Sequence, residues 1–225
     1  MTSEEFVAAA KLEAKEYGVT LHESPLDHVA MTYPNGVVEK CNGFFDEAYG
    51  DPPHPVLAWQ TGTPFEQWFP IFIHEYNHMR QWIEKEPTWA AYLKAPDFFN
   101  WLNEIDELSD EDAEASCLAW ALNEVNCDAR VVQMLSDKQL SLDIDHYIRT
   151  ANAYAWFYFW ALEHRSWYTI GYEPYNTAGI VEAMPEEMPG VDGIAFNKRN
   201  YKRHYRAIFE RHMLGADQNI LFSEE

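Results

Sequence analysis

The stretch Trp68-Phe69-Pro70-Ile71-Phe72-Ile73-His74-Glu75-Tyr76-Asn77-His78-Met79-Arg80-Gln81-Trp82 contains the pattern His74-Glu75-x-x-His78. Positions four apart lie above one another on one face of a helix, so the two imidazoles can point at one place. Zinc accepts neutral imidazole nitrogen at about 2.0–2.1 Å, and its catalytic sites usually have three protein ligands and a water. Glu75 is rotated by about 100° from His74. Its carboxylate therefore lies beside the metal, where it can take a proton from that water.

The neighbouring residues predict that this stretch is helical. Thr63-Pro64-Phe65-Glu66 has the pattern of a capping box with proline at the first helical position, so we expect the helix to begin there. Pro70 fits poorly inside a helix, and we expect a kink at Pro70 or a restart near Phe69. Two stripes follow helical spacing. The apolar stripe is Phe65, Trp68, Phe69, Phe72, Tyr76, Met79 and Ile83, and the second is Ile71, His74, Glu75, His78 and Trp82.

A third metal ligand is predicted in a second long helix, over residues 109–135, which Ser109 or Asp110 can cap. Glu124 and Asp128 are four apart and share a face of this helix. One carboxylate can bind the metal while the other holds the far nitrogen of a ligating histidine.

Simpler interpretations of these residues remain open. His74 and His78 can be ordinary polar residues of an amphipathic helix. Glu124 and Asp128 can be solvated carboxylates in an acidic chain. Cys117 and Cys127 can compete as soft ligands, although Cys127 is rotated away from Glu124 on the helix.

The two motifs together, His74-Glu75-x-x-His78 and Asn123-Glu124-x-x-x-Asp128, resemble those of the gluzincins, the thermolysin-like branch of the zincin zinc metallopeptidases. The resemblance covers residues 63–135. It implies that His74, His78 and Glu124 bind one zinc ion, that Glu75 is the general base, and that Asp128 is the partner of His74. No counterpart of the family's downstream oxyanion-stabilising residue stands out. The candidates come from an aromatic-rich helix predicted over residues 142–168, which is otherwise expected to form core. They are Tyr154, Tyr158, His164 and Tyr168.

The order of the predicted elements gives an α+β, zincin-like fold, with a small mixed N-terminal sheet and a helical C-terminal half. We expect one domain over residues 1–225, with the sheet and motif helix in residues 1–86 and a helical subdomain in residues 87–225. The N-terminal part has a helix over 2–17, strand character from 19 to 21, strands at 28–33 and 37–41 around the turn Pro34-Asn35-Gly36, and a loop over 42–55. The strand Val56, Leu57, Ala58, Trp59 and Gln60 follows. By the resemblance it forms the cleft edge that pairs with substrate, and its alternative is an ordinary interior strand.

Composition excludes several classes of partner. The chain has 225 residues and a formal net charge of −21, so free nucleic acid and anionic membrane should be repelled. Its three cysteines have no paired spacing, and its N-terminus lacks an apolar run. We therefore expect reduced thiols, no signal peptide and a cytoplasmic protein. The segment from Lys198 carries six of the 16 basic residues, and it is expected to dock on the acidic body of the chain.

The sequence thus predicts zinc-dependent hydrolysis of peptide bonds in a peptide or protein substrate. The first alternative is a non-proteolytic protein that keeps the zinc helix for structure or regulation. The second is a di-iron carboxylate oxidoreductase, because Glu75-x-x-His78 matches one of its two ligand pairs. A second such pair is missing from the sequence. The third is a partner-binding protein that uses the basic helix and has a vestigial site.

Overall fold

The computed structural model describes residues 1–32, 38–169, 171–189 and 194–220, so the turn Pro34-Asn35-Gly36 lies outside the described residues. The chain divides into two compact units. Unit 1 comprises Met1–Trp89 and Arg130–Leu142, and unit 2 comprises Ala90–Ala129 and Asp143–Glu225. The expected class is confirmed, because the chain is α+β, mostly helical, with a small mixed sheet.

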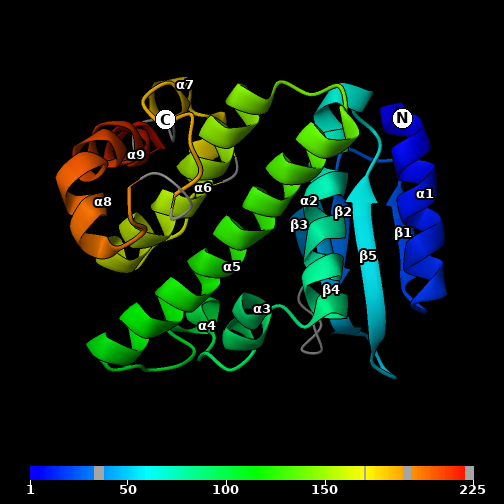
Figure 1. Ribbon diagram of the computed structural model, residues 1–225. Coiled ribbons are helices and arrows are strands. Elements are labelled where there is room, and N and C mark those ends of the chain that lie inside the picture. Colours follow the sequence, from blue (N-terminus) through cyan, green and yellow to red (C-terminus); the bar gives the residue numbers. More distant parts are fainter. Residues whose placement is uncertain (33–37, 170, 190–193, 221–225) are drawn as a thin grey trace. The chain divides into compact units, whose positions relative to one another are not determined.

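The helices and strands are labelled in Figure 1. The first part of the chain contains α1 (Ser3–Glu16), β1 (Thr20–Ser24), β2 (Val29–Thr32), β3 (Val38–Cys41), β4 (Gly43–Tyr49), β5 (His54–Gln60), α2 (Phe65–Glu84) and α3 (Pro87–Tyr92). The second part contains α4 (Phe98–Leu102), α5 (Asp110–Lys138), α6 (Ile144–His164), the short 3-10 helix η1 (Pro174–Asn176), α7 (Ala178–Val181), α8 (Lys198–His204) and α9 (Arg206–Ile220).

The three-stranded sheet of unit 1 has the order β1-β5-β4, and β2 pairs with β3 in a separate ribbon. β5 runs parallel to β1 and antiparallel to β4, so both of its sides are paired. The expectation that Val56–Gln60 forms a cleft edge is therefore wrong, and the interior strand is the observed alternative. The loop expected over residues 42–55 is also wrong, because half of it, Gly43–Tyr49, forms β4. Asn42 and Gly43 before the Phe44-Phe45 pair, and the aspartates, glycine and prolines after it, are turn-forming residues that concealed the strand.

The first helix begins and ends as its sequence predicts. Thr2 accepts a hydrogen bond from the Glu5 backbone, and the Glu5 side chain accepts one from the Thr2 backbone, which completes the capping box. Gly18 follows the helix with φ +74°, a left-handed conformation that glycine adopts without steric cost.

The motif helix α2 begins differently from the prediction. Its N-cap is Pro64 and it has no side-chain cap, so the expected capping box at Thr63 is wrong. The Thr63 hydroxyl is instead bonded to the side chain of Gln60, at the end of β5. The helix then runs through Pro70 to Glu84 without a restart at Phe69.

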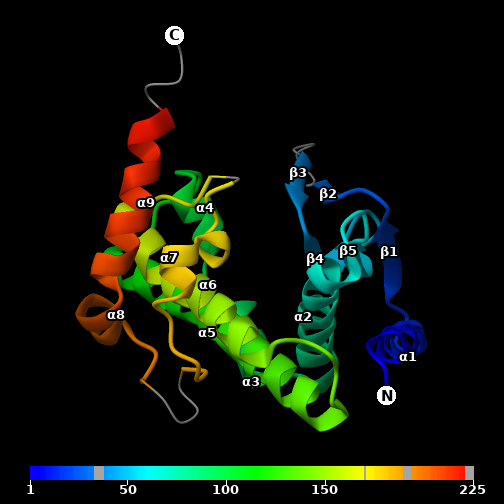
Figure 2. The ribbon, with the colours of Figure 1, turned by 90° about the horizontal axis from the view of Figure 1, so that it is seen from above.

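Aromatic packing fixes the orientation of α2 within unit 1. The ring of Phe72 lies 4.9 Å from that of Trp59 on β5. Phe6 of α1 makes edge contacts with Phe69, Phe72 and Tyr76, which places α1 beside α2 (Figure 2). The predicted apolar stripe is therefore the face of the helix that packs against this core. The second stripe, which carries His74 and His78, lies on a different face of the helix.

Polar contacts join α1 and α2 at the rim of this core. The Tyr76 hydroxyl donates to the Glu13 carboxylate, and Arg80 forms an ion pair with Glu13. Burial, together with the hydrogen bond to Glu13, raises the pKa of Tyr76 to about 12, so Tyr76 stays a neutral donor at physiological pH. Arg80 and Arg130 both pair with Glu84, which ties the unit 1 part of α5 to α2.

The core of unit 2 surrounds α6. Its central residues are buried almost all round, as the run of aromatic residues in this helix predicts. The basic segment docks on acidic residues of the same unit: Lys198 pairs with Glu114, and Lys202 and Arg206 both pair with Glu163. The expectation for these three cations is confirmed. In the part of the chain that the structure describes, no helix is long and apolar enough to cross a bilayer.

Replacing Phe72 with alanine should lower the free energy of unfolding by about 3–5 kcal/mol, because a fully buried aromatic ring would leave a cavity. Urea denaturation followed by circular dichroism measures this. Leu12→Ala is the control, since Leu12 is 63% exposed on α1 and its loss should change stability by less than about 0.5 kcal/mol. Equal effects of the two substitutions would contradict the assignment of the buried face.

Candidate metal centre

His74 and His78 direct their imidazoles at one place. They lie one turn apart on α2, with ring centroids 4.7 Å apart and planes at 84°. The two Nε2 atoms are 3.1 Å apart. Two zinc–nitrogen bonds of about 2.0–2.1 Å at a tetrahedral angle would hold their nitrogens roughly 3.3 Å apart. The pair therefore has the spacing of two ligands of one ion.

His78 is held by two further residues of unit 1. It is 7% exposed, and its Nδ1 lies 2.7 Å from the Oε1 of Gln81, which is fully buried. The ring of Trp89 packs against His78 at 5.8 Å. Neither residue stands out in the sequence as part of a site. Gln81 lies three residues after His78, and residues at this spacing are neighbours on a helix. That spacing is the feature of the sequence from which the contact could have been predicted.

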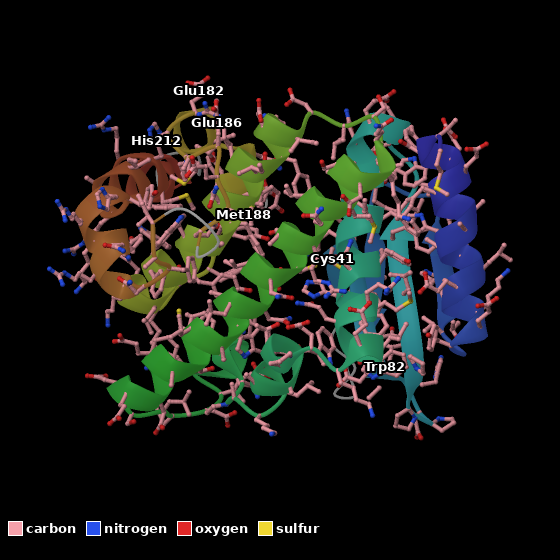
Figure 3. The ribbon with its side chains drawn as sticks, viewed as in Figure 1. Cys41, Trp82, Glu182, Glu186, Met188 and His212 are labelled. Atoms are coloured by element: carbon pink, nitrogen blue, oxygen red, sulfur yellow. The ribbon has the colours of Figure 1, made fainter. Side chains whose placement is uncertain are left out.

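Glu75 lies beside strand β4. A Cβ atom placed on Gly43 would be 3.0 Å from the Cγ of Glu75, 2.8 Å from Cγ2 of Ile71 and 2.9 Å from the Ala58 carbonyl oxygen. Glycine at position 43 therefore permits β4 to approach α2 where Glu75 projects. Trp82 of α2, which is labelled in Figure 3, packs on Phe45 of β4 with ring centroids 5.6 Å apart. These contacts fix the helix face that carries Glu75 against the strand.

His74 and His78 of unit 1 can contribute to a site that holds a metal ion. Cys127 belongs to the unit 2 part of α5, one turn before the part of that helix that belongs to unit 1. Imidazole nitrogen and cysteine thiolate both suit zinc better than magnesium or calcium. Cys127 is therefore the competing candidate for the third ligand.

Glu124 and Asp128 belong to the unit 2 part of α5. Asp128 is 3% exposed, and its Oδ1 accepts a hydrogen bond of 2.6 Å from the Tyr147 hydroxyl. Tyr147 does not stand out in the sequence as part of a site. The roles of Glu124 as a zinc ligand and of Asp128 as the partner of His74 stay predictions.

Two of the four candidate oxyanion donors gather near Glu124. The hydroxyls of Tyr154 and Tyr158 are 3.5 Å apart. Burial raises the pKa of Tyr158 well above its ordinary value, and the negative charge of Glu124 raises it further. The pKa of Tyr154 is also raised, by burial first, then by Tyr158 and Glu124. Both hydroxyls therefore stay protonated and keep a hydrogen to donate.

The other two candidates have local partners in unit 2. The Tyr168 hydroxyl lies 3.4 Å from that of Tyr175. The Nδ1 of His164 lies 2.9 Å from the carbonyl oxygen of Trp160, and the two rings stack. Cys117 donates to the Tyr158 carbonyl, and burial raises the pKa of its thiol. A thiol that resists ionisation is a poor metal ligand, which counts against Cys117.

Comparison of the chain with protein-family models, with curated proteins and with solved structures found no match. Two convergent imidazoles can bind a divalent metal, and the carboxylate at the next position can exchange protons beside it.

Replacing Gly43 with alanine should lower the free energy of unfolding by about 1–3 kcal/mol, the usual cost of overpacking. The new methyl group would press on the Ala58 carbonyl of the central strand and on Ile71, neither of which can yield without moving the backbone or the helix. Thermal unfolding measures the change, with Ala48→Ser on the exposed part of the same strand as the control. Unchanged stability of Gly43→Ala would contradict the close approach of β4 to α2.

Proposed function

We propose that this protein is a zinc metallopeptidase of the zincin type, in the gluzincin branch, that hydrolyses peptide bonds. The observation that carries the proposal is the 3.1 Å separation of the His74 and His78 Nε2 atoms, with Glu75 on the adjacent position of the same helix. Two nitrogen ligands and a neighbouring carboxylate are the parts that metal-assisted hydrolysis needs. The resemblance of the two sequence motifs to those of the gluzincins supports the same assignment.

The donor atoms suit zinc. His74 and His78 would hold it, with Glu124 as the third ligand that the family resemblance implies and Cys127 as the competing ligand. When bound, zinc would polarise the scissile carbonyl and lower the pKa of a water from 15.7 toward about 7. Asp128 would orient His74 from outside the ligand set.

The residues of the chain carry the proton transfers and the orientation of the substrate. Glu75 accepts the proton of the attacking water and delivers it to the departing amine nitrogen. A protonated tyrosine, Tyr154 or Tyr158, donates a hydrogen bond to the oxygen on which negative charge develops. Both tyrosines are retained as donors by the burial that raises their pKa.

The substrate would be a peptide or protein that adds a strand to β4. In the described residues β4 pairs with β5 on one side only, and Gly43 brings it to Glu75. An extended peptide on this edge would be held by its main chain, and its scissile bond would lie near the general base. β4 would thus be the strand edge that pairs with substrate, a role that the sequence predicted for Val56–Gln60.

A second candidate function is favoured by Cys127. Structural zinc sites are four-coordinate and closed, with cysteine and histidine ligands. If Cys127 completes such a site, the metal would stabilise the fold or regulate it, and no position would remain for a catalytic water.

Substituting Glu75 by glutamine tests the hydrolytic mechanism. The wild type should contain about one zinc per chain by elemental analysis, and it should cleave an unfolded protein substrate. Glu75→Gln should keep the zinc and the fold but lose at least about 100-fold in rate, because the amide takes no proton from water. His78→Ala should lose both zinc and activity. Hydrolysis by Glu75→Gln at the wild-type rate would refute the mechanism, and zinc without any cleavage would favour the second candidate.

Cobalt substitution identifies the third ligand. A cobalt–thiolate bond gives an intense charge-transfer band in the near ultraviolet, which carboxylate and imidazole ligands do not give. We expect no such band, and we expect Glu124→Gln to weaken zinc binding by more than the about 10–100-fold that a change outside the ligand set costs. Cys117→Ser is the matched control for Cys127→Ser on the same helix. A band that disappears in Cys127→Ser, with Glu124→Gln unaffected, would make Cys127 the ligand instead.

A further inference from the structure

Gln81 makes a buried hydrogen bond to the outer face of His78. Its side chain is 0% exposed, and its Oε1 lies 2.7 Å from Nδ1 of the imidazole. The opposite ring nitrogen of His78, Nε2, is the atom that faces His74 at 3.1 Å. One glutamine thus contacts the histidine nitrogen that points away from the candidate metal position.

The chemistry of the two groups fixes where the proton of His78 lies. A neutral imidazole carries one N–H, on either Nδ1 or Nε2. The amide oxygen of Gln81 only accepts, so Nδ1 must be the donor and Nε2 is left with a bare lone pair. A bare lone pair at Nε2 is what a metal requires of a histidine ligand.

Burial strengthens the influence of the hydrogen bond between Gln81 and His78. Both partners are buried, so water does not replace the amide if it is removed. The ring of Trp89 closes one side of the imidazole, and Trp89 in turn packs on Phe45 of β4 at 5.7 Å. His78 therefore has little freedom to turn, and Gln81 decides which of its nitrogens is protonated.

We propose that Gln81 is a positioning residue that selects the metal-binding tautomer of His78. This inference rests on the metal site of the proposed function and deepens it, because it names a residue outside the ligand set that sets metal affinity. Gln81 is neutral, unlike the carboxylate that often orients a ligating histidine. A neutral acceptor orients the ring and adds less to the basicity of the ligand than a carboxylate does.

The test compares three variants at position 81 with wild type. Gln81→Met keeps a side chain of similar length and loses the acceptor. Gln81→Leu does the same with a different shape, in case one of them folds poorly. Gln81→Glu keeps an acceptor and adds charge. Gln67→Met, at an exposed position of the same helix, is the matched control.

Two measurements are made on each protein. Zinc affinity is determined by competition with a chelator of known affinity, and the proton position on His78 is determined in zinc-free protein by ¹⁵N NMR of the histidine rings. We expect wild-type His78 to carry its proton on Nδ1. Gln81→Met and Gln81→Leu should lose that preference and bind zinc about 10–100-fold more weakly. Gln81→Glu should restore the tautomer and bind zinc at least as tightly as wild type.

The outcomes separate the two proposals. If wild type binds zinc and Gln81→Met or Gln81→Leu, folded by circular dichroism, binds it equally well, the role of Gln81 is overturned while the metal site stands. If wild type carries the proton on Nε2, the role of Gln81 is overturned whatever the affinities are. If wild type binds no zinc, the proposed function fails, and the inference fails with it.

Discussion

The burial of one face of α2 is the constraint on which unit 1 depends. Phe72 packs on Trp59 of the central strand and on Phe6 of α1, so the helix has one rotation about its axis that keeps its rings out of water. That rotation also decides where His74, Glu75 and His78 project. A change of one residue in the apolar pattern would turn the stripe that carries the histidines by about 100°. The packing that stabilises the fold therefore also determines the direction in which these three side chains point. Gly43 permits β4 to approach α2 beside Glu75.

The parts of the fold that depend on local chemistry could be predicted from the sequence. The capping box at Thr2 involves residues only three apart, and it forms as its pattern predicts. The start of α2 shows the limit, because Thr63 has the right local pattern but its hydroxyl is bonded to Gln60 instead. The central position of β5 in the sheet could not be predicted from the sequence, because strand order depends on pairing between distant segments. β4 was not predicted because turn-forming residues surround it. Its seven residues also show little of the alternation between apolar and polar side chains that marks a strand.

The candidate site likewise has parts that could be predicted from the sequence and parts that could not. The His74–His78 pair follows from helical spacing alone, and its ligand atoms converge as that spacing requires. Gln81 follows the same spacing but was overlooked, because its role depends on burial that a sequence does not state. Cys127 was judged by its rotation from Glu124 on one helix. The choice between Glu124 and Cys127 as a ligand depends on tertiary structure, which spacing along one helix does not give.

The geometry of the histidine pair limits where its protons can lie. Two imidazole nitrogens 3.1 Å apart cannot both present lone pairs to each other without repulsion. With the Nδ1 proton of His78 directed at Gln81, its Nε2 is an acceptor, so either a proton from His74 or a metal ion must occupy the space between them. The metal-free chain can meet this requirement with a single N–H on His74 Nε2. If a metal ion took that place, the proton would have to move to Nδ1 of His74, so that both rings bind as neutral ligands through Nε2.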